Sequence, residues 1–392
     1  MDGLDRRRLL GLLTGAGVAG LTGALSGCST ATTDSPKATV RIGLLTPQTG
    51  ANKAVGADLE IGFKLYLQLH GNALNGHPVE IVPEDEGDST KSGHDALKRL
   101  HDKQVLAVVG VANPDLLPIV RDTVEAAKIP LLATHMAPAK MLSAFFIWRT
   151  AYLSDEPAKA VASYLRRRVM GKVALVGFDN AANEELMDAF ISEYGSGANN
   201  PIGVAPGTKA SADAYAQYAS QVANRSPGAV FCNLPTGHVG PFMQALAAAG
   251  YKNAVYAPGA SSEGPALDQL GKGAMGLYTA MQYSADLSNL SNHTFSSVFQ
   301  SNYQRTPTSY AVSAYDAAAV LDQALTLNGN EAATPTKINQ QLANVGQIIS
   351  PRGNWQFTQG RAPQQKWYLR RVAMDGPIPS NVLISDLATL GS

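Results

Sequence analysis

The sequence predicts an α/β protein of two doubly wound parallel-sheet lobes, each with helices on both faces of its sheet. Three observations predict this fold class. From Ala38 onward, short apolar runs alternate with amphipathic stretches, and the alternation occurs as two successive series. After Asp286 the pattern changes to helical stretches, followed by two short apolar runs. Strand–helix alternation at this spacing is typical of parallel sheets, and two series predict two lobes.

The first series opens with the apolar run 39–45 and an amphipathic stretch that ends near Gly71. Val55, Leu59 and Phe63 recur there at helical spacing, which predicts a helix. The same reasoning predicts strands at 79–82, 105–110, 129–133 and 145–149, and helices at 91–103 and 116–128.

The second series continues the alternation up to Met281. It predicts helices at 156–170, 183–194, 212–224 and 240–250, and strands at 172–178, 202–205, 229–234, 254–257 and 277–281. The remaining chain predicts helices at 293–304, 309–327 and 335–345, and closing strands at 354–357 and 367–372.

Residues 1–28 have the features of an export signal. A charged head precedes the uncharged run 9–25, which is too short and too rich in glycine and alanine to span a bilayer stably. The final Leu-Ser-Gly-Cys resembles the lipobox of bacterial lipoproteins, which implies that Cys28 is acylated and becomes the new N-terminus. Arg6-Arg7 resembles a twin-arginine signal, and the choice between that route and the general route stays open. The small polar residues 29–37 predict a flexible tether.

Composition excludes several classes of function. Thirty-one basic and 31 acidic residues give a net charge of zero, so nothing favours a nucleic acid as partner. The GxGxxG at residues 15–20 lies inside the export signal and therefore predicts no dinucleotide cofactor. His94 and His101 would lie two helical turns apart, too far for one metal ion. We expect neither an enzyme nor a bound cofactor or metal, and we expect Cys232 to be a buried apolar residue.

Several segments resemble the leucine/isoleucine/valine-type (type I) periplasmic solute-binding proteins of ABC importers. The similar segments are Arg41–Gly50, Val108–Gly110, Phe146–Thr150, Lys172–Val176, Ala314–Ala317 and Gly353–Phe357, in the family's order. The resemblance implies two lobes joined by three crossovers, with the ligand in the cleft between them. It places the first lobe at 38–150 plus 285–349 and the second at 151–284 plus 350–392.

The resemblance also implies a site, and this sequence departs from the family pattern there. Amino-acid-binding members hold the ligand carboxylate with a serine and a threonine, and the matching positions here are Pro114 and Ala137. A second-lobe tyrosine matches Ala182, and Glu263 is the acid nearest to the ammonium-binding position. Neither proline nor alanine offers a hydroxyl, although backbone amides of the same loops could compensate. These loops also offer Asn113, Thr134, His135, Met136, Asn183 and Ser261, each of which can equally serve as a turn or cap residue.

We therefore expect a lipid-anchored solute-binding protein on the outer side of a bacterial cell membrane. It would capture an amino acid, an amide or a small organic acid and deliver it to an ABC permease. The missing hydroxyls predict that the ligand is not a simple branched-chain amino acid. A receptor of the same fold that feeds a regulator stays open as the alternative.

Overall fold

The structure is a computed structural model that describes residues 37–141, 144–169, 171–198, 202–204 and 209–391. The predicted export signal with Cys28, and the predicted tether up to Pro36, lie outside the described residues. The chain from Lys37 onward forms one compact unit. No helix among the described residues is both long enough and apolar enough to cross a membrane.

The first lobe contains a six-stranded sheet in the order β2-β3-β1-β4-β5-β6. All neighbours in it pair in parallel except β2 and β3. The strands are β1 (Val40–Thr46), β2 (Ala73–Leu74), β3 (His77–Asp85), β4 (Ala107–Gly110), β5 (Leu131–Ala133) and β6 (Ile147–Arg149). Because parallel strands end at one edge, the loops after β1, β4 and β5 lie together.

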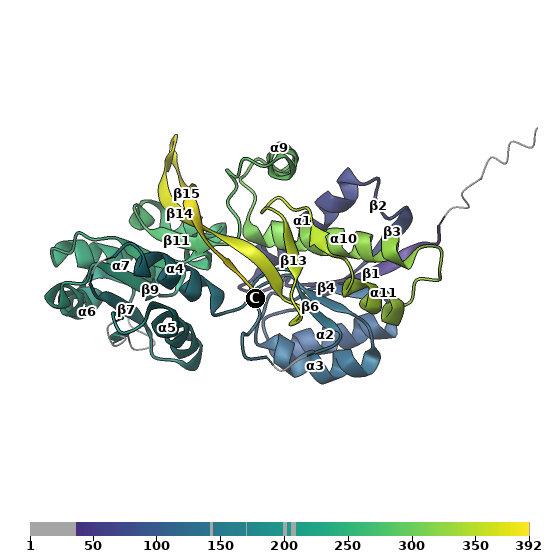
Figure 1. Ribbon diagram of the computed structural model, residues 1–392, viewed down its shortest axis with the longest axis horizontal. Helices are drawn as coiled ribbons and strands as arrows, with labels where there is room; N and C mark the ends of the chain where they lie inside the picture. Colours follow the sequence, from purple (N-terminus) through teal and green to yellow (C-terminus); the bar gives the residue numbers. More distant parts are fainter. Residues whose placement is uncertain (1–36, 142–143, 170, 199–201, 205–208, 392) are drawn as a thin grey trace, which may run out of the picture. The chain divides into compact units, whose positions relative to one another are not determined.

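Helices cover both faces of this sheet (Figure 1). One face carries α1 (Lys53–Leu69), α10 (Ser309–Asn328) and α11 (Pro335–Leu342), and the other carries α2 (Thr90–Asp102) and α3 (Leu116–Ala127). Neighbouring β1 residues alternate between the two cores, since Leu44 packs with α1 and Leu45 packs with α2. Helices α1 and α10 approach closely at Gly62, where an added Cβ would lie 1.9 Å from the Ala311 carbonyl oxygen.

The second lobe contains a nine-stranded sheet in the order β12-β13-β14-β11-β10-β9-β7-β8, with β15 paired to β14. Strands β7 to β11 pair in parallel, whereas β14 is antiparallel to β11, β13 and β15. The strands are β7 (Val173–Phe178), β8 (Ile202–Val204), β9 (Ala229–Asn233), β10 (Val255–Pro258), β11 (Tyr278–Met281), β12 (Gln347–Ile348), β13 (Trp355–Phe357), β14 (Pro363–Asp375) and β15 (Ile378–Leu390).

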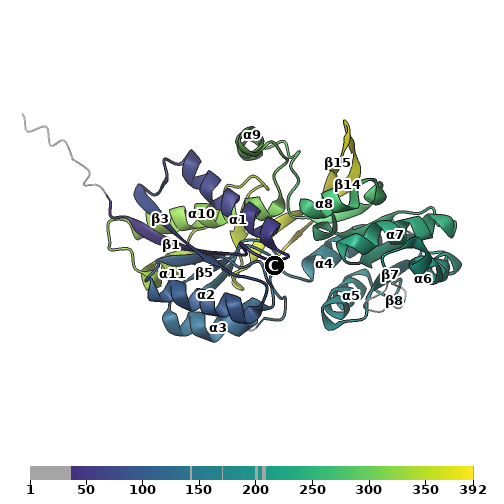
Figure 2. The same cartoon turned by 180° about the vertical axis from the view of Figure 1, so that it is seen from behind.

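Helices cover this sheet on both faces as well (Figure 2). Helices α4 (Glu156–Arg166) and α5 (Ala181–Tyr194) share one core, and α6 (Ala212–Arg225) and α7 (Thr236–Ala248) share the other. The short helix α8 (Pro265–Leu270) lies between two 3₁₀ turns, Gly259–Ser262 and Gly271–Ala274. Helix α9 (Leu290–Tyr303) packs its phenylalanines in one cluster with Leu65 of α1.

The predicted fold class of two α/β lobes with parallel sheets is confirmed. The expectation for the chain end was wrong in detail, because the last predicted strand, 367–372, is part of a longer strand and a further strand, β15, follows it. Helix α8 was also not predicted. The exact lobe boundaries stay a prediction, because β12 and β13 pair toward β14 while Ile348 and Trp355 pack in the first-lobe core.

Candidate functional site

A cavity of about 240 Å³ lies where the loops of both lobes meet. The first lobe lines it with the start of α1 and with Tyr310 in the first turn of α10. The second lobe lines it with the start of α7, the turn after β10, and α8. The lining residues are Ala51, Ala54, Val55, Thr236, Ala260, Glu263, Pro265, Ala266, Gln269 and Tyr310.

Three acidic residues at and just after the end of β3, Asp85, Glu86 and Asp88, fix the loops on the first-lobe side. Asp85 accepts hydrogen bonds from the Gln48 backbone N–H at 2.7 Å and from the Thr49 hydroxyl at 2.6 Å. Asp88 accepts from the Ala51 backbone N–H at 2.9 Å. Both carboxylates therefore hold the loop that leads from β1 into α1, where the cavity begins.

Glu86 fixes the loop after β4, where Asn113 and Pro114 were predicted to meet the ligand. Its two carboxylate oxygens accept the backbone N–H groups of Ala112, at 2.8 Å, and Asn113, at 2.7 Å. Glu86 is 1 % exposed, and burial raises its pKa to about 7. The loop bends sharply before these amides, since Val111 has φ 68°, a conformation that β-branched residues rarely adopt. The Asn113 side chain turns back and accepts the Asp115 N–H at 3.0 Å.

The loop after β5 carries four of the predicted site residues. Its two ends are fixed, because the Thr134 N–H and hydroxyl donate to the Gly110 carbonyl at 2.9 and 3.1 Å and the Ala137 N–H donates to the Tyr152 carbonyl at 2.9 Å. Met136, between them, packs against the core that contains α4.

His135, the remaining residue of this loop, packs against the cavity residue Tyr310 with its ring tilted by 38° to the tyrosine ring. Its ring centroid lies 5.2 Å from that of Tyr310. The side chain is half-buried, and its buried Nδ1 has no hydrogen-bond partner among the described residues. Burial lowers the pKa of His135 to about 4, so the imidazole is neutral near pH 7. A neutral imidazole can donate to or accept from a ligand.

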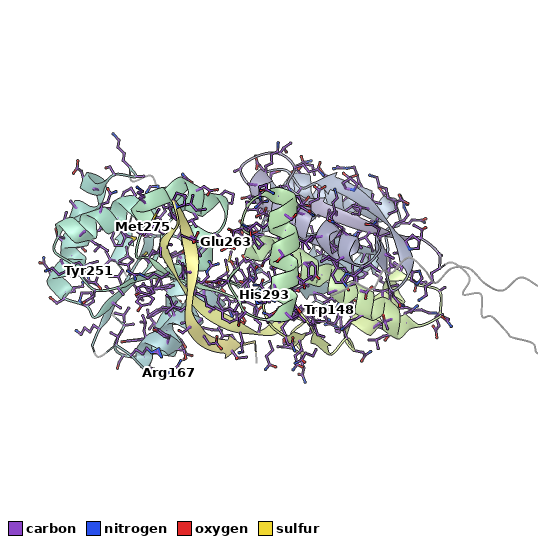
Figure 3. The ribbon with its side chains drawn as sticks, turned by 90° about the horizontal axis from the view of Figure 1, so that it is seen from above. Trp148, Arg167, Tyr251, Glu263, Met275 and His293 are labelled. Atoms are coloured by element: carbon purple, nitrogen blue, oxygen red, sulfur yellow. The ribbon has the colours of Figure 1, made fainter. Side chains whose placement is uncertain are left out.

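Glu263, which is labelled in Figure 3, lies in the cavity wall. Other groups of the protein already engage its carboxylate. Oε2 lies 2.7 Å from Nη1 of Arg370 on β14, and Oε1 accepts the Ser309 backbone N–H at 2.6 Å. Glu263 and Arg370 are both almost fully buried. The contact with Ser309 places a negative charge at the N-terminus of α10, where the helix dipole favours it. Glu263 therefore joins the segment after β10 to a first-lobe helix.

The other second-lobe candidates have mainly structural surroundings. The Asn183 N–H donates to its N-cap residue Asn180 at 2.9 Å, and the buried Asn183 side chain accepts from Asn233 at 3.0 Å. Ala182 is exposed in the first turn of α5, and Ser261 is buried in the 3₁₀ turn after β10.

A buried ion pair lies where the lobes connect. Oδ2 of Asp316, on α10, lies 2.9 Å from Arg352 Nε and accepts hydrogen bonds from Ser350 Oγ and Trp355 Nε1, each at 3.0 Å. Arg352 also donates to the carbonyl of Ala151, which follows β6, at 3.5 Å. These bonds connect α10 to the linking segments that pass between the two sheets.

Sequence reasoning missed three residues of this region: Glu86, Tyr310 and Arg370. Tyr310 had a local signal, because Thr308 caps α10 and places the next residues at a helix start facing the cleft. Glu86 and Arg370 had none, since their partners are distant in sequence. Among the described residues no group of three His, Cys, Asp or Glu side chains is placed to hold a metal ion. Cys232 is buried as predicted, and burial raises its pKa to about 12.

Comparison with known proteins places this geometry in a family. Residues 39–377 match the family model described as periplasmic binding protein. The Leu/Ile/Val-binding protein homologue 6 of Brucella abortus is 22 % identical over 345 residues, which cover 85 % of this chain and 87 % of that protein.

Solved structures of ABC-transporter solute-binding proteins share the fold. One from Rhodopseudomonas palustris in complex with benzoate is 22 % identical, with a TM-score of 0.75, and the match covers 90 % of this chain and 98 % of that protein's chain. A substrate-binding protein from Sphaerobacter thermophilus is 21 % identical, with a TM-score of 0.81, and the match covers 91 % of this chain and 99 % of that protein's chain.

Proposed function

This chain belongs to the periplasmic binding protein family, and we propose that it is the lipid-anchored solute-binding component of an ABC importer. It captures a small polar molecule outside the cytoplasm and delivers it to a membrane permease, without catalysing a reaction. Acylation of Cys28 holds it at the membrane.

The cavity between the lobes is the observation that carries this proposal. Its walls come from loops and helix starts at the carboxyl ends of parallel strands in both sheets, the usual ligand position in such folds. Its volume of about 240 Å³ suits a small molecule rather than a peptide or polymer. Because both lobes line it, a hinge motion can close it around the ligand.

The ligand we propose is a small organic acid or amide and not a branched-chain amino acid. Pro114 and Ala137 lack the hydroxyls that hold a carboxylate in amino-acid-binding relatives. Glu263, the acid nearest to the ammonium position, is neutralised by Arg370. Each missing charge-assisted hydrogen bond is worth about 1.5–3 kcal/mol. An α-amino acid loses a partner for its ammonium group as well as these hydroxyls, so it should bind roughly two orders of magnitude more weakly than an acid or amide that has no ammonium group.

His135 and Tyr310 form the contact surface that we assign to the ligand. Their ring centroids lie 5.2 Å apart with a tilt of 38° between the planes, and His135 Nδ1 has no partner among the described residues. A planar ligand can stack on the Tyr310 ring while its polar atom bonds the imidazole. The benzoate complex of the Rhodopseudomonas palustris protein supports aromatic acids as the first probes.

Isothermal calorimetry tests this proposal with L-leucine, L-isoleucine, L-valine, benzoate and benzamide as probes. We expect benzoate or benzamide to bind at least 100-fold more tightly than any of the amino acids. His135→Ala should abolish that binding, whereas His94→Ala should not, because His94 bonds Thr123 on the α2–α3 side of the sheet. Micromolar or tighter binding of one of the three amino acids would contradict the assigned ligand class.

A further inference from the structure

Two arginines meet at the edge of the first-lobe sheet, and neither of them lines the solute cavity. Arg149 ends the edge strand β6, and Arg361 lies in the turn between β13 and β14. The Arg149 backbone N–H donates to the Arg361 carbonyl at 2.9 Å, and Arg149 Nη1 donates to the Gly360 carbonyl at 2.6 Å. The Arg149 side chain is therefore held beside this turn, where the residue is only 7 % exposed.

Arg361 is held by two aromatic rings and by a backbone carbonyl. Its guanidinium lies over Phe145, 5.0 Å from the ring centroid, and over Trp148, at 4.9 Å (Trp148 is labelled in Figure 3). Nη1 donates to the Ala144 carbonyl at 3.1 Å. The backbone of Arg361 is left-handed, with φ 57°, a conformation that bulky residues rarely adopt. Arg361 is half-buried and Phe145 is exposed, so this side of the arginine pair reaches solvent.

The arginine pair lacks a negative charge. A buried guanidinium is normally paired with an acid, because removing its charge from water is costly. Among the described residues, neither Arg149 nor Arg361 forms an ion pair, and the Nε atom of each is buried without a hydrogen-bond partner. Burial and the neighbouring Arg361 guanidinium lower the pKa of Arg149. The acid that interacts electrostatically with Arg361 is Glu125, and its carboxylate already accepts the Phe146 N–H at 2.8 Å.

We propose that Arg149 and Arg361 form a binding site for a phosphate-type oxyanion, which supplies the missing negative charge. Only Nη1 of each guanidinium is hydrogen-bonded within the described part of the chain, so both arginines keep donors for one anion. Phosphate suits this arrangement, because arginine binds its oxygens through pairs of N–H groups in a fixed geometry. Free phosphate and the headgroup of an anionic phospholipid offer the same chemistry. The bound anion joins β6 to the turn between β13 and β14.

Phosphate titration of the chain that begins at Lys37, the start of the compact unit, tests this site. The side-chain ¹H–¹⁵N resonances of the Arg149 and Arg361 Nε–H groups report on it, and sodium chloride at equal ionic strength is the reference. Arg361→Gly is the principal variant, because glycine adopts the left-handed conformation without strain and therefore keeps the turn. Arg371→Gln is the matched control, because the exposed Arg371 also lies over an aromatic ring, 5.5 Å from Tyr278, but on β14 beside β11 of the second lobe.

Phosphate should shift both Nε–H resonances of the parent saturably, and chloride should not. Arg361→Gly should bind phosphate at least tenfold more weakly, measured at the Arg149 resonance, whereas Arg371→Gln should match the parent. Arg149→Gln should lose as much, measured at the Arg361 resonance; if this variant does not fold, Arg361→Gly decides alone. Resonances that stay unmoved, that respond equally to chloride, or that titrate equally in Arg361→Gly would overturn the proposal.

Sedimentation with lipid vesicles distinguishes the two sources of phosphate. Binding to phosphatidylglycerol vesicles that is absent with phosphatidylcholine vesicles, and is lost in Arg361→Gly, would identify the lipid headgroup as the ligand. A parent protein that stays in solution with both kinds of vesicle, but titrates with phosphate, would identify the free anion. Binding of neither would overturn the site. These measurements need no transported solute, so their failure is distinguishable from a failure of solute binding in the calorimetric panel.

Discussion

Replacing Asp316 by asparagine should lower the free energy of unfolding by about 3 kcal/mol, because it leaves the buried Arg352 guanidinium without its counter-charge. The side chains of Asp316 and Arg352 are 0 % and 1 % exposed, and their closest atoms, Oδ2 and Nε, are 2.9 Å apart. The asparagine oxygen can still accept from Ser350 and Trp355, which bond the same carboxylate in the wild type. The change therefore removes the charge and little else.

The expected loss of about 3 kcal/mol follows from the burial of the Asp316–Arg352 ion pair. Breaking a buried ion pair by removing one partner typically costs about 3–5 kcal/mol. The lower end applies here, because Glu156 also interacts electrostatically with Arg352 and compensates in part. Burial raises the pKa of Asp316 to about 6, so the measurement belongs at pH 7.5, where the carboxylate is ionised.

Urea unfolding followed by tryptophan fluorescence measures this loss. Glu80→Gln is the control, since its exposed ion pair with Arg41 should contribute less than about 1 kcal/mol. The double variant Asp316→Asn/Arg352→Met should recover part of the stability, because neither charge is then buried alone. A loss below about 1 kcal/mol for Asp316→Asn, or no recovery in the double variant, would refute this reasoning.

Three further predictions follow from the sequence and the site. Cys28→Ser should release the protein from the membrane fraction of cells, because acyl chains on this cysteine provide the proposed attachment; retention equal to the parent would exclude the lipobox assignment. A saturating probe that binds in calorimetry should reduce the radius of gyration in small-angle scattering, since only the closed state gains the contacts of both lobes; an unchanged curve would rule out hinge closure. Between pH 5 and pH 7 the parent should lose stability relative to Glu86→Gln, because the raised pKa of Glu86 makes the folded state hold a proton that the unfolded chain releases. If urea unfolding gives the same difference in unfolding free energy between the two proteins at pH 5 and at pH 7, the raised pKa of Glu86 is contradicted.

Local patterns predicted most of the helices and strands, because their periodicities depend on residues that are close together in the sequence. Helix α10 was predicted as 309–327 and is Ser309–Asn328, and the strand 229–234 appears as Ala229–Asn233. Strand β15 was missed because its residues are mostly exposed or half-buried and lack a continuous apolar run. Its stability comes from pairing with β14, a contact that sequence periodicity does not report.

The sequence predicted which loops form the site but not the hydrogen bonds and ion pairs that hold them. The loops after β4 and β5 follow from the rule that ligands bind at the carboxyl ends of parallel strands. The partners of Glu86 and Glu263 depend on tertiary packing, since 26 and 107 residues separate Glu86 from Ala112 and Glu263 from Arg370. The family-like motifs Ala314–Ala317 and Gly353–Phe357 are in contact in the structure, because Asp316 accepts a hydrogen bond from Trp355.

Native mass spectrometry of the freshly purified protein, begun at Lys37, tests the central claim that a small solute binds between the lobes. We predict a bound species of low mass that is lost on denaturation, and that is also absent from Tyr310→Ala and His135→Ala purified in the same way. The control His94→Ala should retain it. A bound molecule present equally in all four proteins would contradict a site at the cavity beside Tyr310.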